Sequence, residues 1–221
     1  MLVENGITLG SITTNASVLD EQTSLKLLKY PLKTVHISID GATKQIYESI
    51  RHLPYEKVVN NIRVFLKLRK ELNRHDISVR MQMTVFEKNR HEVKPFIEMW
   101  KNYLIPGVDD FAFLNASNYA GLTDIEYEKR GLRIPCGRVW NDQIMVAVNG
   151  NVCLCCWDYN VNNNIGNVFT EGSFESIWNN AKMKHIRNLH ISGNFKAIPL
   201  CEKCNDNNFV KSYYKLIPVA F

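Results

Sequence analysis

The stretch "KTVHISIDGAT", residues 33–43, decides the fold class of this chain. Apolar and polar side chains alternate along it, so that each kind occupies one face of an extended segment. The apolar face carries Val35, Ile37 and Ile39, and the polar face carries Thr34, His36, Ser38 and Asp40. This pattern predicts a β-strand that buries only one of its two faces.

Strand and helix patterns alternate on both sides of this stretch. Strands are expected at 10–15, 77–85 and 109–114, and helices at 20–30, 53–72 and 91–104. Such alternation predicts a parallel sheet. Because the strands are apolar on one face only, the helices must cover that face and the polar face must look into a polar space. A barrel lumen fits this pattern, and an open sheet with one solvated face is the alternative.

The cysteines gather in the last part of the chain. The six cysteines are Cys136, Cys153, Cys155, Cys156, Cys201 and Cys204, and none lies before position 136. In a cytoplasmic protein, clustered cysteines are more often metal ligands than disulfides. The asymmetry predicts two regions of different chemistry, with a boundary within residues 115–135.

A hairpin and a cysteine pair dominate this second region. The segment "QIMVAVNGNVCLCCW", residues 143–157, predicts a hairpin with a two-residue type I′ turn at Asn149-Gly150. A helix is expected at 172–190, with Ser173 as its cap. The pair "CEKC", residues 201–204, points two thiolates at one metal. Four-thiolate sites hold zinc or an iron–sulfur cluster, and spacing alone leaves both possible.

Composition excludes several classes of partner. The 221 residues are 45% hydrophobic and 22% charged, which is ordinary for a globular protein. The net charge of +5 is small and evenly spread, so we expect no nucleic-acid partner. The sequence contains neither an apolar run of membrane-spanning length nor a signal-peptide pattern. We therefore expect a cytoplasmic protein without a membrane partner.

A series of motifs resembles the SPASM domain of radical S-adenosylmethionine (SAM) enzymes. The series "PCGRVW", "NGNVCLCCWD", "GNV", "SIW" and "CEKC" covers residues 135–204. Upstream, "TNAS", "HISIDGATKQIYESIR" and "EKVVNNI" resemble the second half of the radical SAM barrel, from its third strand onward. The resemblance implies an α/β fold, with the C-terminal half of a partial (β/α) barrel and a small cysteine-rich SPASM-like domain built from a β-hairpin and a helix. It divides the chain into a barrel part (1–118), a linker (119–134) and a SPASM-like domain (135–221).

The resemblance also implies a metal group and its ligands. It predicts an auxiliary [4Fe-4S] cluster held by Cys136, Cys155, Cys201 and Cys204. Cys155 takes the first position of the double cysteine, where the family places its ligand. Strand alternation then turns Cys156 to the opposite face as a packing residue and leaves Cys153 as a spare, with ligation by Cys153 in place of Cys155 as the alternative.

The polar strand face is expected, by the same resemblance, to look toward SAM. The candidate SAM-binding residues are Ser38, Asp40, Asn15, Arg51 and Gln82. Ser38 is expected near the ribose, and Arg51 is the candidate partner of the methionine carboxylate. The alternatives are a turn role for Asp40 and ordinary polar contacts for the others. We expect His36, His185 and His190 to be structural or surface residues, and we assign no catalytic residue.

One departure from the family affects the expected activity. Radical SAM enzymes carry a C-x3-C-x2-C motif whose cluster passes an electron to SAM, and this sequence contains no such motif. We expect the C-terminal portion of a longer enzyme, inactive by itself in reductive SAM cleavage. The parent would oxidise or modify a peptide, sugar or antibiotic precursor, with a reductase or the missing N-terminal half as a partner. The alternative is a non-enzymatic zinc or iron–sulfur module that recognises a partner.

Overall fold

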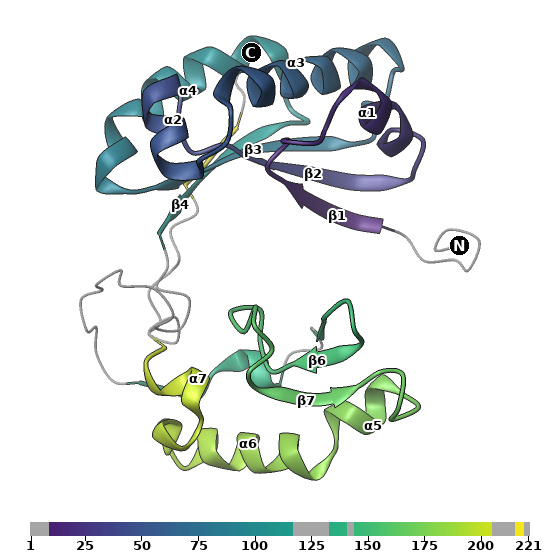
Figure 1. Ribbon diagram of the computed structural model, residues 1–221, viewed down its shortest axis with the longest axis vertical. Coiled ribbons are helices and arrows are strands. Elements are labelled where there is room, and N and C mark those ends of the chain that lie inside the picture. Colours follow the sequence, from purple (N-terminus) through teal and green to yellow (C-terminus); the bar gives the residue numbers. More distant parts are fainter. Residues whose placement is uncertain (1–8, 117–132, 141–143, 205–214, 219–221) are drawn as a thin grey trace. The chain divides into compact units, whose positions relative to one another are not determined.

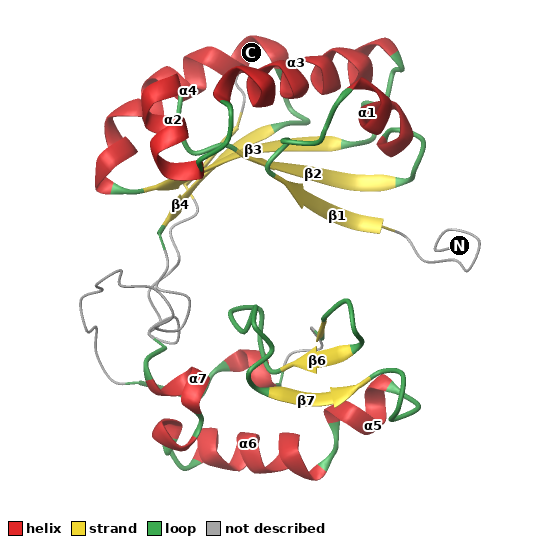
Figure 2. Ribbon diagram, viewed as in Figure 1, coloured by secondary structure: helices red, strands yellow, loops and turns green. Residues whose placement is uncertain are grey.

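The structure is a computed structural model that describes residues 9–116, 133–140, 144–204 and 215–218. The chain forms two compact units, and each is described by itself. The first unit comprises the chain up to Ala116 together with the C-terminal strand, and the second unit is formed by the part of the sequence between them. Figure 1 shows the elements in chain order, and Figure 2 separates helices from strands.

The first unit is a sheet with one layer of helices. Its strands are β1 (Leu9–Thr14), β2 (Leu32–Ser38), β3 (Ser78–Val85), β4 (Asp110–Asn115) and β8 (Lys215–Pro218). Its helices are α1 (Glu21–Leu27), α2 (Lys44–Arg51), α3 (Tyr55–Glu71) and α4 (Val93–Trp100), with 3-10 turns η2 (Glu87–Glu92) and η3 (Lys101–Tyr103). The helices lie on one face of the sheet, and within the described part of this unit no helix lies on the other (Figure 2). This arrangement confirms the α/β class and the one-sided burial expected from the strand pattern.

The strands run in the order β1-β2-β3-β4-β8. The first four are parallel, and their register aligns the polar side chains in rows across the open face. One row joins His36 of β2 to Arg80 of β3 and Asp110 of β4, and the next joins Ser38 to Gln82. Polar side chains of neighbouring strands therefore meet near the carboxyl ends of β2 and β3, where α/β proteins place their ligands.

The helix-covered face carries the core of the first unit. Ile37 of β2 and Met81 of β3 are fully buried, as are Phe65 of α3 and Phe96 and Trp100 of α4. The alternation in β2 and β3 directs every second residue into this core, and the 3.6-residue period of α3 supplies the opposite side. Burial of this apolar surface is the main force that holds the unit together.

A buried ion pair ties the helix layer to the sheet. The guanidinium of Arg69, from α3, lies against the carboxylate of Asp109, just before β4, and both side chains are fully buried. Asp109 also accepts hydrogen bonds from the backbone N–H groups of Val79 (2.8 Å) and Ile105 (2.7 Å). Arg69 donates to the carbonyl of Ile77 as well (2.8 Å). Together these bonds engage both oxygens of Asp109 and the two terminal nitrogens of Arg69, and leave only its Nε without a partner among the described residues. A buried pair depends on such additional bonds.

The C-terminal strand places part of the chain differently from the expected domain division. The sequence analysis assigned residues 135–221 to the cysteine-rich domain. In the structure, β8 pairs antiparallel with β4, and Ile217 lies opposite Phe111. This strand therefore belongs to the first unit, because a backbone hydrogen-bond ladder joins it to the sheet. The strand carries no turn or alternation signal long enough to identify it from sequence.

The second unit combines a small antiparallel sheet with short helices. Its strands, in the order β5-β6-β7, are β5 (Met145–Val146), β6 (Asn151–Cys153) and β7 (Asn164–Asn167). Its helices are α5 (Phe174–Trp178), α6 (Ala181–Ile191) and α7 (Pro199–Glu202), with 3-10 turns η5 (Gly137–Val139) and η6 (Phe195–Ala197). Val152, Ile165, Ile177 and Ile186 are among the buried residues of its core. None of the helices in the described ranges of the chain is both long and apolar enough to cross a lipid bilayer.

Local details in this unit differ from the sequence expectation. The hairpin turn is not type I′, because only Gly150, and not Asn149, has a positive φ. The N–H of Gly150 bonds the carbonyl of Ala147, and the N–H of Ala147 bonds the carbonyl of Asn151, which makes a three-residue loop. The helix expected at 172–190 is two helices, because Asn180 caps a new one through a bond from the N–H of Met183 (2.9 Å). Ser173 caps α5 as expected.

Candidate functional site

Four cysteines, from three segments of the chain, line one pocket of the second unit. Cys136 precedes η5, Cys155 follows β6, Cys201 lies in α7 and Cys204 lies just after it. Among the described residues, these four and no other cysteine line this pocket. The structure thus brings together the four thiols that the sequence analysis selected as ligands, although the first and last stand far apart in the chain.

A tight turn directs Cys155 toward the pocket. Strand β6 ends at Cys153 after a register shift, and the N–H of Asp158 bonds the carbonyl of Cys155 (3.0 Å). The buried carboxylate of Asp158 holds the far side of the turn, because it accepts the N–H groups of Asn162 (2.9 Å) and Asn163 (2.7 Å). Asp158 is therefore a structural residue of the site that the sequence analysis did not single out.

The same turn changes the expected roles of the other two cysteines. The sequence analysis extended strand alternation through residue 157, which made Cys156 a packing residue and Cys153 a spare. The structure shows the reverse: Cys153 is buried, with 8% of its surface exposed, and Cys156 is exposed. The reason is that alternation holds only while the strand is paired, and pairing stops at Cys153.

The C-terminal cysteine pair sits on a short helix that an arginine holds in place. Pro199 begins α7, and the N–H of Cys204 bonds the carbonyl of Cys201 (3.2 Å), so both thiols face one side. The guanidinium of Arg133 donates to the carbonyls of Cys201 and Glu202 at the end of this helix. It also lies over the ring of Phe195, 4.3 Å from the ring centre. Arg133 thereby fixes the helix and lines the pocket.

The thiols interact electrostatically. Burial, followed by repulsion from the thiolates of Cys204, Cys155 and Cys136, raises the pKa of Cys201 to about 12, and the charge of Arg133 acts in the opposite direction. A hydrogen bond with Cys156 and burial raise the pKa of Cys155. Both shifts favour the protonated thiols of Cys155 and Cys201. A bound metal group would reverse this by displacing the protons.

The lining of the pocket fits an anionic, sulfur-ligated metal group. Besides the four thiols, its walls are apolar or basic, with Leu154, Leu200, Arg133 and Arg138 among them, and no carboxylate lines it. Within the described residues, no three Cys, His, Asp or Glu side chains converge closely enough to hold a single ion. Four thiols in a wall of this kind suit either zinc or a cluster in which each of several irons takes one thiolate.

His190 is a residue of this site that the sequence analysis missed. It lies in the last turn of α6 and is fully buried. Its Nδ1 accepts the backbone N–H of Cys136 (3.2 Å), and its Nε2 lies 3.6 Å from Sγ of Cys201. Burial, followed by the charge of Arg133, lowers the pKa of His190, which favours the neutral ring. A single histidine at a core position of a helix carries no sequence signal that would have identified this role.

In the first unit, two of the five SAM candidates lie side by side. Ser38 ends β2, Gln82 lies beside it on β3, and the Gln82 amide donates to the Ser38 hydroxyl (2.7 Å). Both belong to the polar face that no described helix of this unit covers. In the neighbouring row, Arg80 and Asp110 form an ion pair at 2.6 Å. The hydroxyl and the amide therefore meet where β2 ends, whereas the charged pair lies toward the amino ends of β3 and β4.

The other three candidates take part in local structure. The carboxylate of Asp40 is buried and accepts the N–H of Thr84 (2.7 Å). Its second oxygen lies 2.6 Å from Nε of Arg51, in an ion pair that is not aligned as a hydrogen bond. Asn15 uses its side-chain oxygen to accept from the N–H (3.0 Å) and hydroxyl (2.8 Å) of Ser17. Asp40 and Arg51 therefore brace the loop after β2, and Asn15 closes its own turn.

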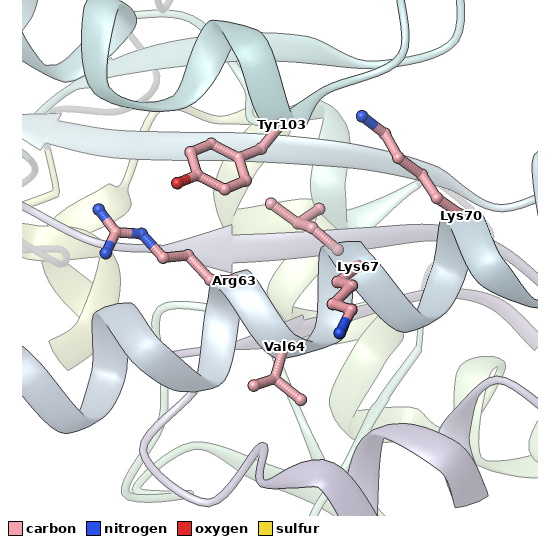
Figure 3. Close-up of a pocket in the computed structure, with 6 residues that line it drawn as sticks. Arg63, Val64, Lys67, Lys70 and Tyr103 are labelled. Atoms are coloured by element: carbon pink, nitrogen blue, oxygen red, sulfur yellow. The ribbon is translucent and has the colours of Figure 1, made fainter.

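A second pocket lies between α3 and η3 in the first unit (Figure 3). It is lined by Arg63, Val64, Leu66, Lys67, Lys70 and Tyr103. The guanidinium of Arg63 lies 5.6 Å from the centre of the Tyr103 ring, and Lys67 pairs with Glu71 at 3.6 Å. These contacts are typical of a solvated helix face, and no carboxylate, histidine or cysteine is among the described residues that line this pocket.

Comparisons with known proteins agree with this geometry. The family model SPASM, described as an iron–sulfur cluster-binding domain, matches residues 136–205. None of the curated proteins matches the chain. Among solved structures, Streptococcus suis SuiB bound to S-adenosylmethionine is similar with a TM-score of 0.60 and 14% identity, over 84% of this chain and 51% of that chain. SuiB bound to the precursor peptide SuiA has the same values.

The structural likeness shows the fold, and the chain spans about half the length of the solved structures that it matches. The SPASM match covers the four candidate ligands. Together, these findings confirm the resemblance of residues 136–205 to the SPASM family of iron–sulfur cluster-binding domains, and they show that the chain shares its fold with part of SuiB.

Proposed function

We propose that the second unit holds an auxiliary [4Fe-4S] cluster through Cys136, Cys155, Cys201 and Cys204. One observation carries the proposal: four thiols chosen from sequence line a single pocket in the segment that matches an iron–sulfur cluster-binding family. The basic and apolar walls support it, because a cluster with four thiolates is anionic and is stabilised by nearby positive charge and N–H donors.

The ligand set favours electron transfer over substrate binding. When bound, such a cluster supplies a one-electron acceptor or donor. Four cysteines leave no iron with an open position, so the site has no place for a substrate ligand. The protein contributes N–H donors to the ligand sulfurs: the backbone N–H of Trp157 lies 3.3 Å from Sγ of Cys155. It also contributes positive charge, from Arg133 and Arg138 in the pocket wall.

We further propose that the open face of the first unit contributes to a SAM site. Ser38 and Gln82 lie next to each other there, near the carboxyl ends of two parallel strands. This is the edge at which parallel α/β folds bind ligands. A hydroxyl and an amide suit the hydrogen-bonding groups of a ribose. The proposed activity of the whole enzyme is SAM-dependent radical modification of a substrate.

A peptide is the substrate class that the comparison favours. The similar SuiB structure was determined with a precursor peptide bound, although its likeness to this chain is one of fold. The assignment can be tested by measuring backbone hydrogen exchange of this protein in the presence of precursor peptides, sugars or antibiotic precursors. We expect precursor peptides to slow the exchange of segments of this protein. Slower exchange only with sugars or antibiotic precursors would contradict a peptide substrate.

Cysteine variants test the cluster proposal. Serine should replace each of the four pocket cysteines, and Cys156→Ser is the matched control because Cys156 is adjacent but exposed. After anaerobic reconstitution, iron and sulfide per chain should fall at least about tenfold in the four variants, because an alcohol is a poor ligand for iron. The control should load like the wild type.

Two outcomes would contradict this proposal. Stoichiometric zinc without iron uptake by the wild-type protein would favour the zinc module instead. Full iron content in Cys155→Ser, together with a loss in Cys153→Ser, would mean that the turn after β6 places the other thiol in the pocket.

A further inference from the structure

His190 connects two ligand-bearing segments of the pocket. Its ring packs against two aromatic rings. The ring centres of Trp140 and His190 are 6.1 Å apart, with an angle of 89° between the ring planes. The ring centres of Phe195 and His190 are 5.2 Å apart, with an angle of 77°. Edge-to-face packing against these two rings, together with full burial, restricts the orientation of the imidazole. In that orientation its two nitrogens face Cys136 and Cys201.

The hydrogen bond at one nitrogen determines what the other can do. A backbone N–H only donates, so Nδ1 of His190, which lies 3.2 Å from the nitrogen of Cys136, is the acceptor and carries no proton. A neutral imidazole then carries its proton on Nε2. That nitrogen lies 3.6 Å from Sγ of Cys201, a normal N–H···S distance given the large radius of sulfur.

We propose that His190 is a positioning residue that donates an N–H···S hydrogen bond to Cys201 and thereby raises the reduction potential of the cluster. This inference rests on the proposed function, because it assumes that Cys201 is a cluster ligand. Reduction adds negative charge that spreads onto the ligand sulfurs. A donor aimed at one of those sulfurs stabilises the reduced state more than the oxidised state.

The structure of α6 explains how the histidine is held. Met183, Ile186 and His190 share the buried face of this helix. The guanidinium of Arg187, on the neighbouring face, donates to the carbonyl of Val139 (2.8 Å), and this bond fastens α6 to the segment that carries Cys136. The imidazole thus reaches the pocket from a rigid element, as precise positioning requires.

Two variants of His190 separate its two hydrogen bonds. A glutamine side chain reaches as far as Nε2 of the histidine and can still donate a hydrogen bond to Cys201. His190→Gln should therefore keep the reduction potential of the cluster close to that of the wild type. Asn reaches only as far as Nδ1, so His190→Asn can accept from Cys136 but loses the donor to sulfur. Its ratio of reduced to oxidised cluster at a fixed potential should fall about tenfold, which is 59 mV for a one-electron couple.

The experiment is a redox titration of the reconstituted wild-type chain and both variants, followed by electron paramagnetic resonance. His185→Asn is the matched control, because His185 lies on the same helix but is exposed. In the reduced wild type labelled with 15N-histidine, an exchangeable proton that couples to a histidine nitrogen should be detected near the cluster, and it should disappear in D2O and in His190→Asn. The N–H of Trp157, which faces Cys155, should give its own signal in both proteins.

The outcomes distinguish this inference from the proposed function. If the wild type takes up no cluster, the proposed function fails, and this inference fails with it. If the wild type and His190→Asn both carry a full cluster at the same potential, the proposed function stands and only the role of His190 is overturned. If His190→Asn fails to load iron, His190→Gln labelled with side-chain 15N-glutamine decides: an exchangeable proton that couples to a glutamine side-chain nitrogen near the cluster supports the inference, and its absence refutes it.

Discussion

The two units of this protein hold themselves together in different ways. In the first unit, strands and helices bury a large apolar cluster that includes Ile37, Phe65, Met81 and Trp100. In the second unit the apolar cluster is much smaller among the described residues, and Cys155, Cys201 and Cys204 pack at its edge. Small cores provide little stability by themselves and often depend on a metal or disulfide.

This difference changes what a site residue does for the fold. In the first unit, Ser38 and Gln82 lie on the face opposite the core, so packing does not require them. In the second unit, the candidate ligands join η5, the turn after β6 and α7 to one another. The residues that form the site there also hold the segments together, so a metal group bound to them would contribute to folding.

Removal of the cluster should have the largest effect, and it should be confined to one unit. We expect peptides from α6 and α7 to exchange backbone hydrogens on the order of 100-fold faster after iron is removed, because metal binding is linked to folding of the segments that carry the ligands. Peptides from α3 and β3 should keep their protection. Hydrogen exchange with mass spectrometry, before and after anaerobic chelation, measures both.

Equal loss of protection in both units would contradict this difference between them. Unchanged exchange rates of α6 and α7 in protein shown to be free of iron would also contradict it, because the small apolar core would then be sufficient to keep the second unit folded.

The second prediction concerns the buried ion pair of the first unit. Arg69→Met should lower the free energy of unfolding of this unit by about 3–5 kcal/mol, because it leaves the charge of Asp109 buried without its partner. Urea unfolding followed by exchange of β3 peptides measures the change. Lys67→Met is the control, since Lys67 pairs with Glu71 at the exposed surface, and its cost should be below about 1 kcal/mol. Equal effects of the two substitutions would refute the role of the buried pair.

The smallest effect on stability is expected on the open face. Gln82→Ala should cost about 1 kcal/mol or less, because it removes one partly exposed hydrogen bond to Ser38. It should weaken SAM binding by roughly tenfold if the amide contacts SAM, as measured by calorimetry. Thr34→Ala, on the same face but at the amino end of β2, should leave SAM binding unchanged. Equal SAM affinities of the wild type and Gln82→Ala would remove Gln82 from the site.

Much of the first unit could be predicted because its patterns are local. The alternation at residues 33–39 and 77–85 correctly predicted β2 and β3, and the helical period after Pro54 correctly predicted α3. The sequence analysis did not predict helix α2, because its eight residues span only about two turns, too few for a helical period to stand out. Hydrophobic period is a reliable signal where an element buries one continuous face.

The sequence by itself determined the one-sided parallel sheet and the choice of four cysteines as candidate ligands. Only the tertiary structure decided that Cys153 is buried and Cys156 exposed, that β8 joins the first sheet, and that His190 faces Cys201. The physical reason is the range of the interactions. Alternation and helical period act between near neighbours, whereas a strand's end, an edge pairing and a bond between an imidazole and a thiol depend on segments that are brought together only by folding.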